Sequence, residues 1–313
     1  MSTPKIVFLD AKTVGDIPEL EELKSLGDAT LYDYTAPAEV NERISDATIV
    51  LTNKVKLGAA QMSQAPNLKL ICVTATGTNN VDHAAAAKRG IEIKNVAGYA
   101  VETVAQHTFA VLLHLLHQIR FYDDHVKSGD YSRGGSFTNL DRPFVELHAK
   151  RMGIIGLGNI GRAVARIAKA GFGMEVVYYS TSGKNVQPDY EQLSLEELLQ
   201  TSDVVSIHAG LNERTMALIG RKQLTLMRSD AILINMGRGG IVVEKDLAEA
   251  IDEEQLGGAC IDVFEDEPFD LDHPYLKVQR KDRLVLTPHI AWAAVEARRR
   301  LMREVLRGVR GER

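Results

Sequence analysis

The 313-residue chain contains few of the features that mark specialised classes of protein. It has only two cysteines, Cys72 and Cys260, both within apolar runs, so we expect buried thiols and not a disulfide framework. The net charge of −5 excludes the strongly basic character typical of nucleic-acid-binding proteins. No apolar run approaches the length of a membrane span, and the N-terminus lacks the apolar core of a signal peptide. These absences favour a cytoplasmic globular protein with no nucleic-acid or membrane partner.

The chain does show a regular alternation of apolar runs with helical patterns. Within the first hundred residues we expect strands at 5–9, 29–34, 47–52, 68–73 and 91–95, with helices at 17–26, 37–44, 57–62 and 81–88 between them. A second series begins at Arg151, with strands at 152–155, 175–179, 203–208, 231–235, 258–263 and 284–287. Such alternation predicts parallel sheets with helices on both faces, and the length suggests two domains. The predicted fold class is α/β, with two doubly wound parallel-sheet domains and a cleft between them.

A glycine motif lies between the first strand and first helix of the second series. Gly156, Gly158 and Gly161 form a G-x-G-x-x-G pattern, which is weak alone but here has the strand, helix and next strand that a dinucleotide site requires. Gly156 would allow the tight turn, Gly158 the approach of a pyrophosphate, and Gly161 close packing of helix on strand. The helix N-terminus would then attract the phosphates. A purely structural turn is the less favoured alternative.

The segment between the two series has a long helix and then a polar stretch. We expect the helix at 101–119, and residues 120–150 have weak periodicity and many charges. This stretch is either a surface loop or an arm that packs on a second subunit; we favour the arm and a homodimer, because two-fold dimers are common. Three histidines of the helix, His107, His114 and His117, could suggest a metal, but no acidic cluster accompanies them, so we expect no metal site.

Three chemically complementary residues follow the predicted strands of the second series. Arg238 comes after the strand AILIN, Glu267 after ACIDV, and His289 after LVLT. Because the carboxyl ends of parallel strands meet at one edge, these side chains can converge on a cofactor crevice. A guanidinium can bind a carboxylate with two hydrogen bonds, an imidazole can give a proton to a carbonyl oxygen, and a carboxylate can orient the imidazole. Each residue alone has an ordinary structural explanation, but together they predict a 2-oxo acid reductase.

At this point the sequence resembles the D-isomer-specific 2-hydroxyacid dehydrogenase family over nearly its whole length. The resemblance is carried by segments 104–107, 153–161, 206–208, 235–239, 262–268 and 287–291. Its closest type is glycerate dehydrogenase (hydroxypyruvate reductase), suggested by Asn53-Lys54 and by Trp292 after the histidine motif.

The resemblance implies roles for individual residues. Arg238 would hold the substrate carboxylate, and Glu267 with His289 would form the acid–base pair. Asn53, Thr76 and Gly77 would bind substrate from the first domain; a substrate-facing role for Lys54 is left open. The implied cofactor-binding residues are Gly156, Gly158, Asn159, Ile160, Gly161, Ser180, Ala209, Gly210, Thr215, Met236, Gly237 and Asp262, the last against the nicotinamide carboxamide.

The implied domains are a flavodoxin-like substrate domain, residues 1–99 plus 291–313, and a Rossmann cofactor domain, residues 100–290, with 118–150 as the dimerisation arm. Two positions depart from the family pattern. Ser180 stands where an acid would meet the ribose hydroxyls, so NADP is not excluded although we favour NAD. Gly210 replaces the usual proline after Ala209.

The resemblance implies an NAD(P)-dependent reductase of hydroxypyruvate, glyoxylate or a similar small 2-oxo acid, giving a D-2-hydroxy acid. A D-lactate-type or broad-specificity 2-oxo acid reductase is an alternative. A dinucleotide-sensing binding protein on the same fold is a further one. A formate dehydrogenase is disfavoured, because such enzymes have glutamine where Glu267 stands.

Overall fold

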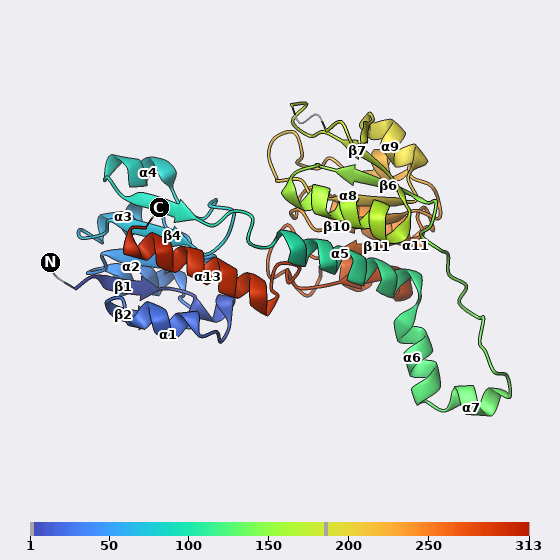
Figure 1. The fold of residues 1–313 in the computed structure, drawn as a ribbon, viewed down its shortest axis with the longest axis horizontal. Helices are drawn as coiled ribbons and strands as arrows, with labels where there is room; N and C mark the ends of the chain where they lie inside the picture. Colours follow the sequence, from blue (N-terminus) through green and yellow to red (C-terminus); the bar gives the residue numbers. More distant parts are fainter. Residues whose placement is uncertain (1–2, 185–186, 313) are drawn as a thin grey trace. The chain divides into compact units, whose positions relative to one another are not determined.

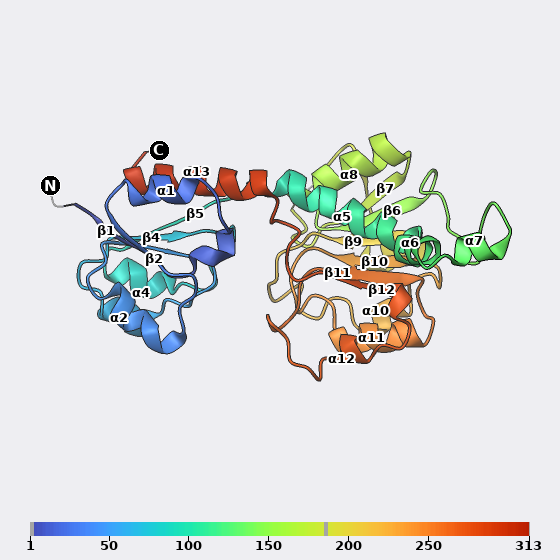
Figure 2. The same ribbon diagram turned by 90° about the horizontal axis from the view of Figure 1, so that it is seen from below.

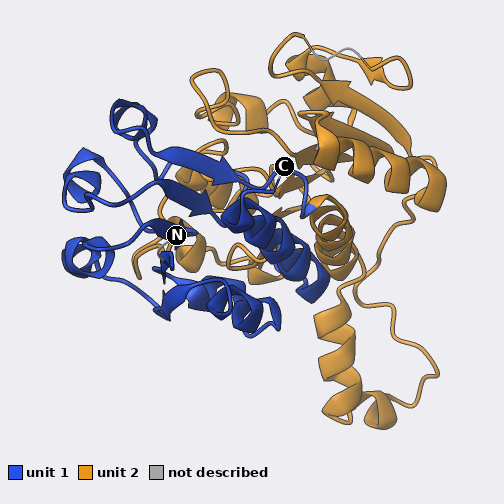
Figure 3. Cartoon of the chain, turned by 60° about the vertical axis from the view of Figure 1, so that its left-hand side comes forward, with its two compact units in different colours: residues 1–100, 292–313 blue, residues 101–291 orange. Residues whose placement is uncertain are grey.

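The computed structural model describes residues 3–184 and 187–312, which fold into two compact units. Unit 1 combines the chain up to Ala100 with the C-terminal segment from Trp292, and unit 2 runs from Val101 to Ala291 (Figure 3). These limits lie one residue from the domain boundaries expected from the sequence. Unit 1 is therefore discontinuous in sequence.

Unit 1 contains a five-stranded parallel sheet in the order β2-β1-β3-β4-β5. Its strands are β1 (Lys5–Phe8), β2 (Asp28–Leu31), β3 (Ile49–Thr52), β4 (Leu70–Val73) and β5 (Glu92–Asn95). Its α-helices are α1 (Glu19–Lys24), α2 (Val40–Ile44), α3 (Ala59–Ser63), α4 (His83–Lys88) and α13 (Val295–Arg310). Alternate strand residues point to opposite faces, so Ile6 and Phe8 pack with α1 and α13 while Val7 and Leu9 pack with α2 and α4 (Figure 2).

Unit 2 contains a seven-stranded parallel sheet in the order β12-β11-β10-β9-β6-β7-β8. Its strands are β6 (Arg151–Ile155), β7 (Glu175–Tyr179), β8 (Glu191–Gln192), β9 (Val204–Ile207), β10 (Ile232–Asn235), β11 (Gly258–Ile261) and β12 (Leu284–Leu286). Its α-helices are α5 (Val101–Leu116), α6 (Ile119–Lys127), α7 (Asp130–Gly134), α8 (Asn159–Phe172), α9 (Leu195–Thr201), α10 (Arg221–Leu224), α11 (Glu244–Asp252) and α12 (Pro274–Lys277). The strand order reverses between β6 and β9, and ligands of doubly wound sheets bind beyond the carboxyl ends of the strands at such a point.

The prediction of two doubly wound parallel-sheet units is confirmed, and most element limits agree within a few residues. The long helix ends at Leu116 and not at residue 119, because Gln118 adopts a left-handed conformation with φ 49°. The polar stretch that follows is partly helical, with α6 and α7 projecting from the sheet of unit 2 (Figure 1). The two-residue strand β8 and the single-turn helix α12 were not predicted, since both are too short to show a periodic pattern.

Within residues 3–184 and 187–312, every helix is too short or too polar to span a membrane.

Candidate active site

The glycine turn joins β6 to α8 at the carboxyl edge of the second sheet. Gly156 has φ +91°, and a Cβ there would lie 3.0 Å from backbone atoms of Ala209. A Cβ on Gly161 would lie 2.4 Å from the carbonyl oxygen of Gly156, so the helix can pack this closely against the turn only because residue 161 has no side chain. At Gly158, in contrast, a Cβ would meet nothing within 4 Å. Two glycines are thus required by the fold itself, whereas the predicted role of Gly158 in the approach of a pyrophosphate stays a prediction.

A cation on the first turn of α8 was missed in the sequence. Arg162 donates hydrogen bonds from its guanidinium to the carbonyl oxygen of Leu157 and to Oδ1 of Asn159. A positive charge at a helix N-terminus opposes the helix dipole, but it is favourable beside a bound phosphate. Its spacing of three residues from Asn159 was the available signal.

The histidine at the end of β9 contributes no charge to this edge. Nε2 of His208 lies 2.9 Å from the hydroxyl oxygen of Ser206. Burial lowers the pKa of His208 to about 3, so the ring is neutral near neutral pH. Among these groups, Arg162 and the N-terminus of α8 carry positive charge near the glycine turn, and His208 does not.

His289 and Glu267 are paired in unit 2. Nδ1 of His289 lies 2.7 Å from Oε2 and 2.9 Å from Oε1 of Glu267, while Oε1 also accepts the backbone N–H of Phe264 at 3.1 Å. Among the described residues, Nε2 of His289 has no hydrogen-bond partner, and the side chain is 24% exposed. The carboxylate orients the ring through one nitrogen and leaves the other available for proton transfer.

The backbone of His289 is held by Asp262. His289 has φ +53°, a left-handed conformation that is uncommon for a non-glycine residue, and its N–H donates to the Asp262 carbonyl at 2.8 Å. The Asp262 carboxylate, 1% exposed, accepts the N–H groups of Ile290 and Ala291 at 2.9 and 2.8 Å and the hydroxyl of Thr287 at 2.6 Å. Asp262 thus clamps the loop on both sides of His289. Both carboxylate oxygens already accept hydrogen bonds from this loop. The predicted contact of Asp262 with a nicotinamide stays a prediction.

Arg238 lies on the loop after β10. The Asn235 side chain accepts the N–H of Gly237 and donates to the carbonyl of Arg238, both at 3.0 Å, which shapes this loop. A Cβ on Gly239 would lie 1.8 Å from the carbonyl oxygen of Phe264, so the loop lies directly against the segment that leads to Glu267. The Arg238 side chain donates to the carbonyl of Gly237 at 2.8 Å and forms no ion pair with a described residue. Its remaining donors are available for an anionic ligand.

The other predicted cofactor-binding residues of unit 2 lie along the same edge but differ in exposure. Gly158, Asn159 and Gly210 are exposed, and Ile160 is half-buried. Thr215 is fully buried, and its hydroxyl donates to the carbonyl of Gly210 at 2.7 Å, so its side chain shapes the loop. Ser180, Ala209, Met236 and Gly237 are also buried. Their contacts with a dinucleotide stay predictions.

The predicted substrate residues of unit 1 lie at the carboxyl ends of β3 and β4. The buried carboxylate of Asp10 accepts the N–H groups of Asn53, Lys54 and Val55 at 2.8, 2.7 and 3.3 Å, which fixes the loop after β3. Burial raises the pKa of Asp10, and these hydrogen bonds oppose the rise. After β4, the Thr76 hydroxyl donates to the carbonyl of Val96 at 3.0 Å. The substrate roles of Asn53, Thr76 and Gly77 stay predictions, and the supporting role of Asp10 had no sequence signal.

His107 contacts other side chains of unit 2. Its Nε2 lies 3.2 Å from the Thr287 hydroxyl and 3.8 Å from Oδ1 of Asp262. In the described part of the chain, no three histidine, cysteine, aspartate or glutamate side chains lie together in a way that could hold a metal ion.

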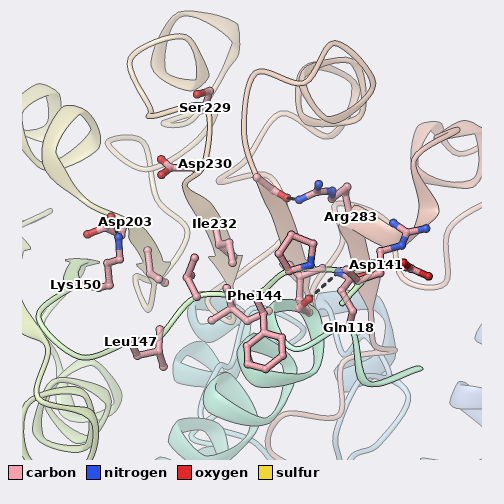
Figure 4. Close-up of a pocket in the computed structure, with 17 residues that line it drawn as sticks. Gln118, Asp141, Phe144, Leu147, Lys150, Asp203, Ser229, Asp230, Ile232 and Arg283 are labelled. Carbon is pink, nitrogen blue, oxygen red and sulfur yellow. Dashed lines mark hydrogen bonds and ion pairs between the residues drawn. The ribbon is translucent and has the colours of Figure 1, made fainter. Parts of the chain in front are cut away.

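A pocket of about 530 Å³ lies at the opposite edge of the second sheet (Figure 4). It is lined by residues at or just before the first positions of β9 and β10, including Asp203 and Ile232, and by Leu147 and Phe144 from the segment before β6. Because the strands are parallel, this is the amino edge, whereas Arg238, Glu267 and His289 follow carboxyl ends. The pocket is separate from the candidate catalytic residues.

Comparison with known proteins agrees with this geometry. Residues 109–291 match the family model described as "D-isomer specific 2-hydroxyacid dehydrogenase, NAD binding domain". The chain is 35% identical to a hydroxypyruvate reductase of Blautia hydrogenotrophica, covering 95% of this chain and 93% of the relative. It is 37% identical to a glycerate dehydrogenase of Methylorubrum extorquens, covering 94% and 91%. A solved structure of an NADPH-dependent glyoxylate/hydroxypyruvate reductase from Sinorhizobium meliloti, in complex with NADP and malonate, is 26% identical with TM-score 0.83 and coverage of 99% and 93%.

The fold and the paired histidine and carboxylate define a nucleotide-dependent oxidoreductase. The chain belongs to the D-isomer specific 2-hydroxyacid dehydrogenase family. It is an NAD(P)-dependent enzyme that interconverts 2-oxo acids and D-2-hydroxy acids.

Proposed function

We propose that the protein reduces a small 2-oxo acid of the hydroxypyruvate or glyoxylate type to the corresponding 2-hydroxy acid. The observation that carries this proposal is the His289–Glu267 pair, whose second imidazole nitrogen has no hydrogen-bond partner among the described residues. The loop that bears Arg238 lies against the segment leading to Glu267, and the guanidinium forms no ion pair within the described part of the chain. The names of the relatives support the choice of substrate class.

Each residue of the candidate site has a separate part in the proposed reaction. NAD(P)H, when bound, would supply the hydride for the carbonyl carbon. Arg238 binds the substrate carboxylate, and a fork of two N–H groups fixes its plane. Nε2 of His289 gives its proton to the carbonyl oxygen, so that hydride and proton together convert C=O into CH–OH. Glu267 holds the ring through Nδ1, and the partly exposed histidine regains a proton from water.

An activity matrix tests this proposal. Purified protein would be assayed with hydroxypyruvate, glyoxylate and pyruvate, each with NADH and NADPH, by following absorbance at the nicotinamide band. We expect hydroxypyruvate and glyoxylate each to give a higher kcat/KM than pyruvate. A higher kcat/KM for pyruvate would instead favour the D-lactate-type alternative. Turnover of none of the three would reject the proposed substrate class.

We further propose that residues 118–150 form an arm that binds a second copy of this chain. Exposed large apolar side chains are concentrated there: Ile119, Val126, Tyr131, Phe137, Leu140, Phe144 and Val145. Phe137 and Leu140 are 90% and 79% exposed, and apolar side chains exposed in this number within one segment support an interaction surface. Symmetric dimers are the commonest assembly of soluble proteins.

The oligomeric state is measured by light scattering after size-exclusion chromatography. We expect a dimer for the unaltered chain and a monomer for the Phe137→Asp/Leu140→Asp double variant. Leu271→Asp, at an equally exposed position outside the arm, is the matched control and should stay dimeric. A monomeric unaltered protein would contradict the arm proposal without affecting the catalytic one.

We also infer a reducing, cytoplasmic location, because Cys72 and Cys260 are both free and buried.

A further inference from the structure

The loop after β7 lacks the acid that a Rossmann domain uses to recognise an unphosphorylated ribose. The strand ends at Tyr179, and residues 180–184 read Ser-Thr-Ser-Gly-Lys, with no carboxylate. A carboxylate at this position would hydrogen-bond the ribose hydroxyls and repel a 2′-phosphate. Its absence removes that repulsion but does not by itself create a phosphate site.

Ser180 provides a second observation. The residue is only 8% exposed, and its hydroxyl has no hydrogen-bond partner among the described residues. Buried hydroxyls are nearly always hydrogen-bonded in folded proteins, since leaving one unsatisfied is unfavourable. The hydroxyl oxygen is itself covered by protein atoms, so Ser180 marks a small polar residue at the start of the loop and is not a contact that the surface already offers.

Arg214 brings a cation to the same loop from a distant part of the sequence. Its guanidinium Nη1 donates to the carbonyl oxygen of Ser182 at 3.2 Å. Within residues 3–184 and 187–312 it forms no ion pair, so its charge is not neutralised by a carboxylate. Lys184 adds a second cation at the same loop, and its backbone N–H donates to the Ser182 hydroxyl.

The segment that carries Arg214 is held by local hydrogen bonds. The Asn212 side chain accepts the N–H of Arg214 at 2.9 Å, and the Asn212 N–H donates to the hydroxyl of buried Thr215 at 2.8 Å. The Thr215 hydroxyl in turn donates to the carbonyl of Gly210. The backbone beneath the guanidinium is thus pre-organised, which reduces the entropy lost when the side chain binds an anion.

We propose that Arg214, together with the 180–184 loop, forms a binding site for the 2′-phosphate of an adenosine ribose, so that the protein prefers NADP(H) to NAD(H). The proposal deepens the proposed function and rests on it, because it assumes that the dinucleotide binds at this edge of unit 2. Arg214 would pair with the phosphate dianion, while the loop hydroxyls and Lys184 complete its hydrogen bonds. The sequence alone favoured NAD; the proximity of Arg214 to Ser182 reverses that preference.

The decisive measurement is nucleotide binding, independent of turnover. Isothermal titration of the full chain would compare adenosine 2′,5′-bisphosphate with adenosine 5′-monophosphate, and NADP⁺ with NAD⁺. We expect the 2′-phosphate to raise affinity about tenfold or more, with the gain shrinking as salt is increased. Arg214→Gln should remove most of this gain and leave binding of the 5′-monophosphate within about twofold.

Two further variants separate a local site from a general effect of charge. Arg221→Gln removes the same charge from an exposed guanidinium that is ion-paired with Glu249, and it should keep the full 2′-phosphate gain. Ser180→Asp should weaken binding of the bisphosphate more than that of the monophosphate. Thermal unfolding of each variant would verify that it is folded.

The outcomes distinguish this inference from the proposed function. If the monophosphate and NAD⁺ bind but the 2′-phosphate adds nothing, or if Arg214→Gln keeps the gain, the phosphate site is wrong and the reductase proposal stands. If no adenine nucleotide binds, both are wrong. A 2′-phosphate gain lost in Arg214→Gln and kept in Arg221→Gln supports the site.

Discussion

The clamp formed by Asp262 predicts the consequence of replacing this residue by asparagine. The carboxylate accepts three hydrogen bonds, from Thr287 and from the N–H groups of Ile290 and Ala291. An amide keeps only one oxygen. If that oxygen stays on Oδ1, which serves two donors, the new NH₂ group faces the N–H of Ala291, and one buried hydrogen bond is replaced by a contact between two donors.

The magnitude follows from this geometry. A hydrogen bond to a charged group contributes about 1.5–3 kcal/mol, and an unsatisfied buried donor costs about 1–3 kcal/mol. We therefore expect Asp262→Asn to lower the free energy of unfolding by about 2–4 kcal/mol. Because the same clamp holds His289 in its left-handed conformation, displacement of the imidazole should lower kcat by roughly 10- to 100-fold.

Urea unfolding and steady-state kinetics would measure the two effects. Asp252→Asn is the matched control, because its carboxylate also accepts backbone N–H groups, those of Gln279 and Arg280, but at an exposed position. This control should lose no more than about 1 kcal/mol and keep its kcat. Unchanged stability and kcat in Asp262→Asn would refute the clamp. A raised KM for the nucleotide with unchanged stability would show instead that Asp262 acts mainly as a cofactor ligand.

The remaining predictions concern catalysis, substrate capture and the glycine turn. His289→Ala should lower kcat by roughly 10²–10⁴, since proton transfer is lost; single-turnover assays with a circular-dichroism check of folding test this, and full activity would exclude the assigned role. Arg238→Lys should chiefly raise the KM for the 2-oxo acid, because an ammonium cannot reproduce the guanidinium fork; unchanged KM and kcat would argue against it. Gly161→Ala should lower the thermal midpoint and the nucleotide affinity together, because the added Cβ would lie 2.4 Å from the Gly156 carbonyl oxygen; a variant with native stability would show that the turn can relax.

The candidate catalytic residues could be predicted from the sequence because of their positions relative to the predicted strands. Glu267 and His289 each follow a short apolar run, and parallel strands bring their carboxyl ends to one edge. The pairing of the two side chains was therefore predictable, and the structure gives their distance as 2.7 Å. Arg238 was identified in the same way, although its role as carboxylate ligand stays a proposal.

The residues that hold the loops of the site by hydrogen bonds could not be predicted in this way. Asp10 and Asn53 are 43 positions apart, and nothing in their local patterns indicates that a carboxylate reaches that backbone N–H. Asp262 was interpreted through the family resemblance as a cofactor ligand, which stays a prediction; that its carboxylate accepts hydrogen bonds from the loop that carries His289 was visible only in the structure. Hydrogen bonds between distant segments depend on loop paths, which have no periodic signature.

The sequence by itself determined the two α/β series, the glycine turn and the family, because strand and helix periodicity and turn chemistry are encoded in neighbouring residues. Tertiary structure alone decided which polar groups support the site and which cation lies beside Ser182. Arg214 is 32 positions from that residue, and only the folding of β7 and β9 into one sheet brings its guanidinium to the Ser182 carbonyl.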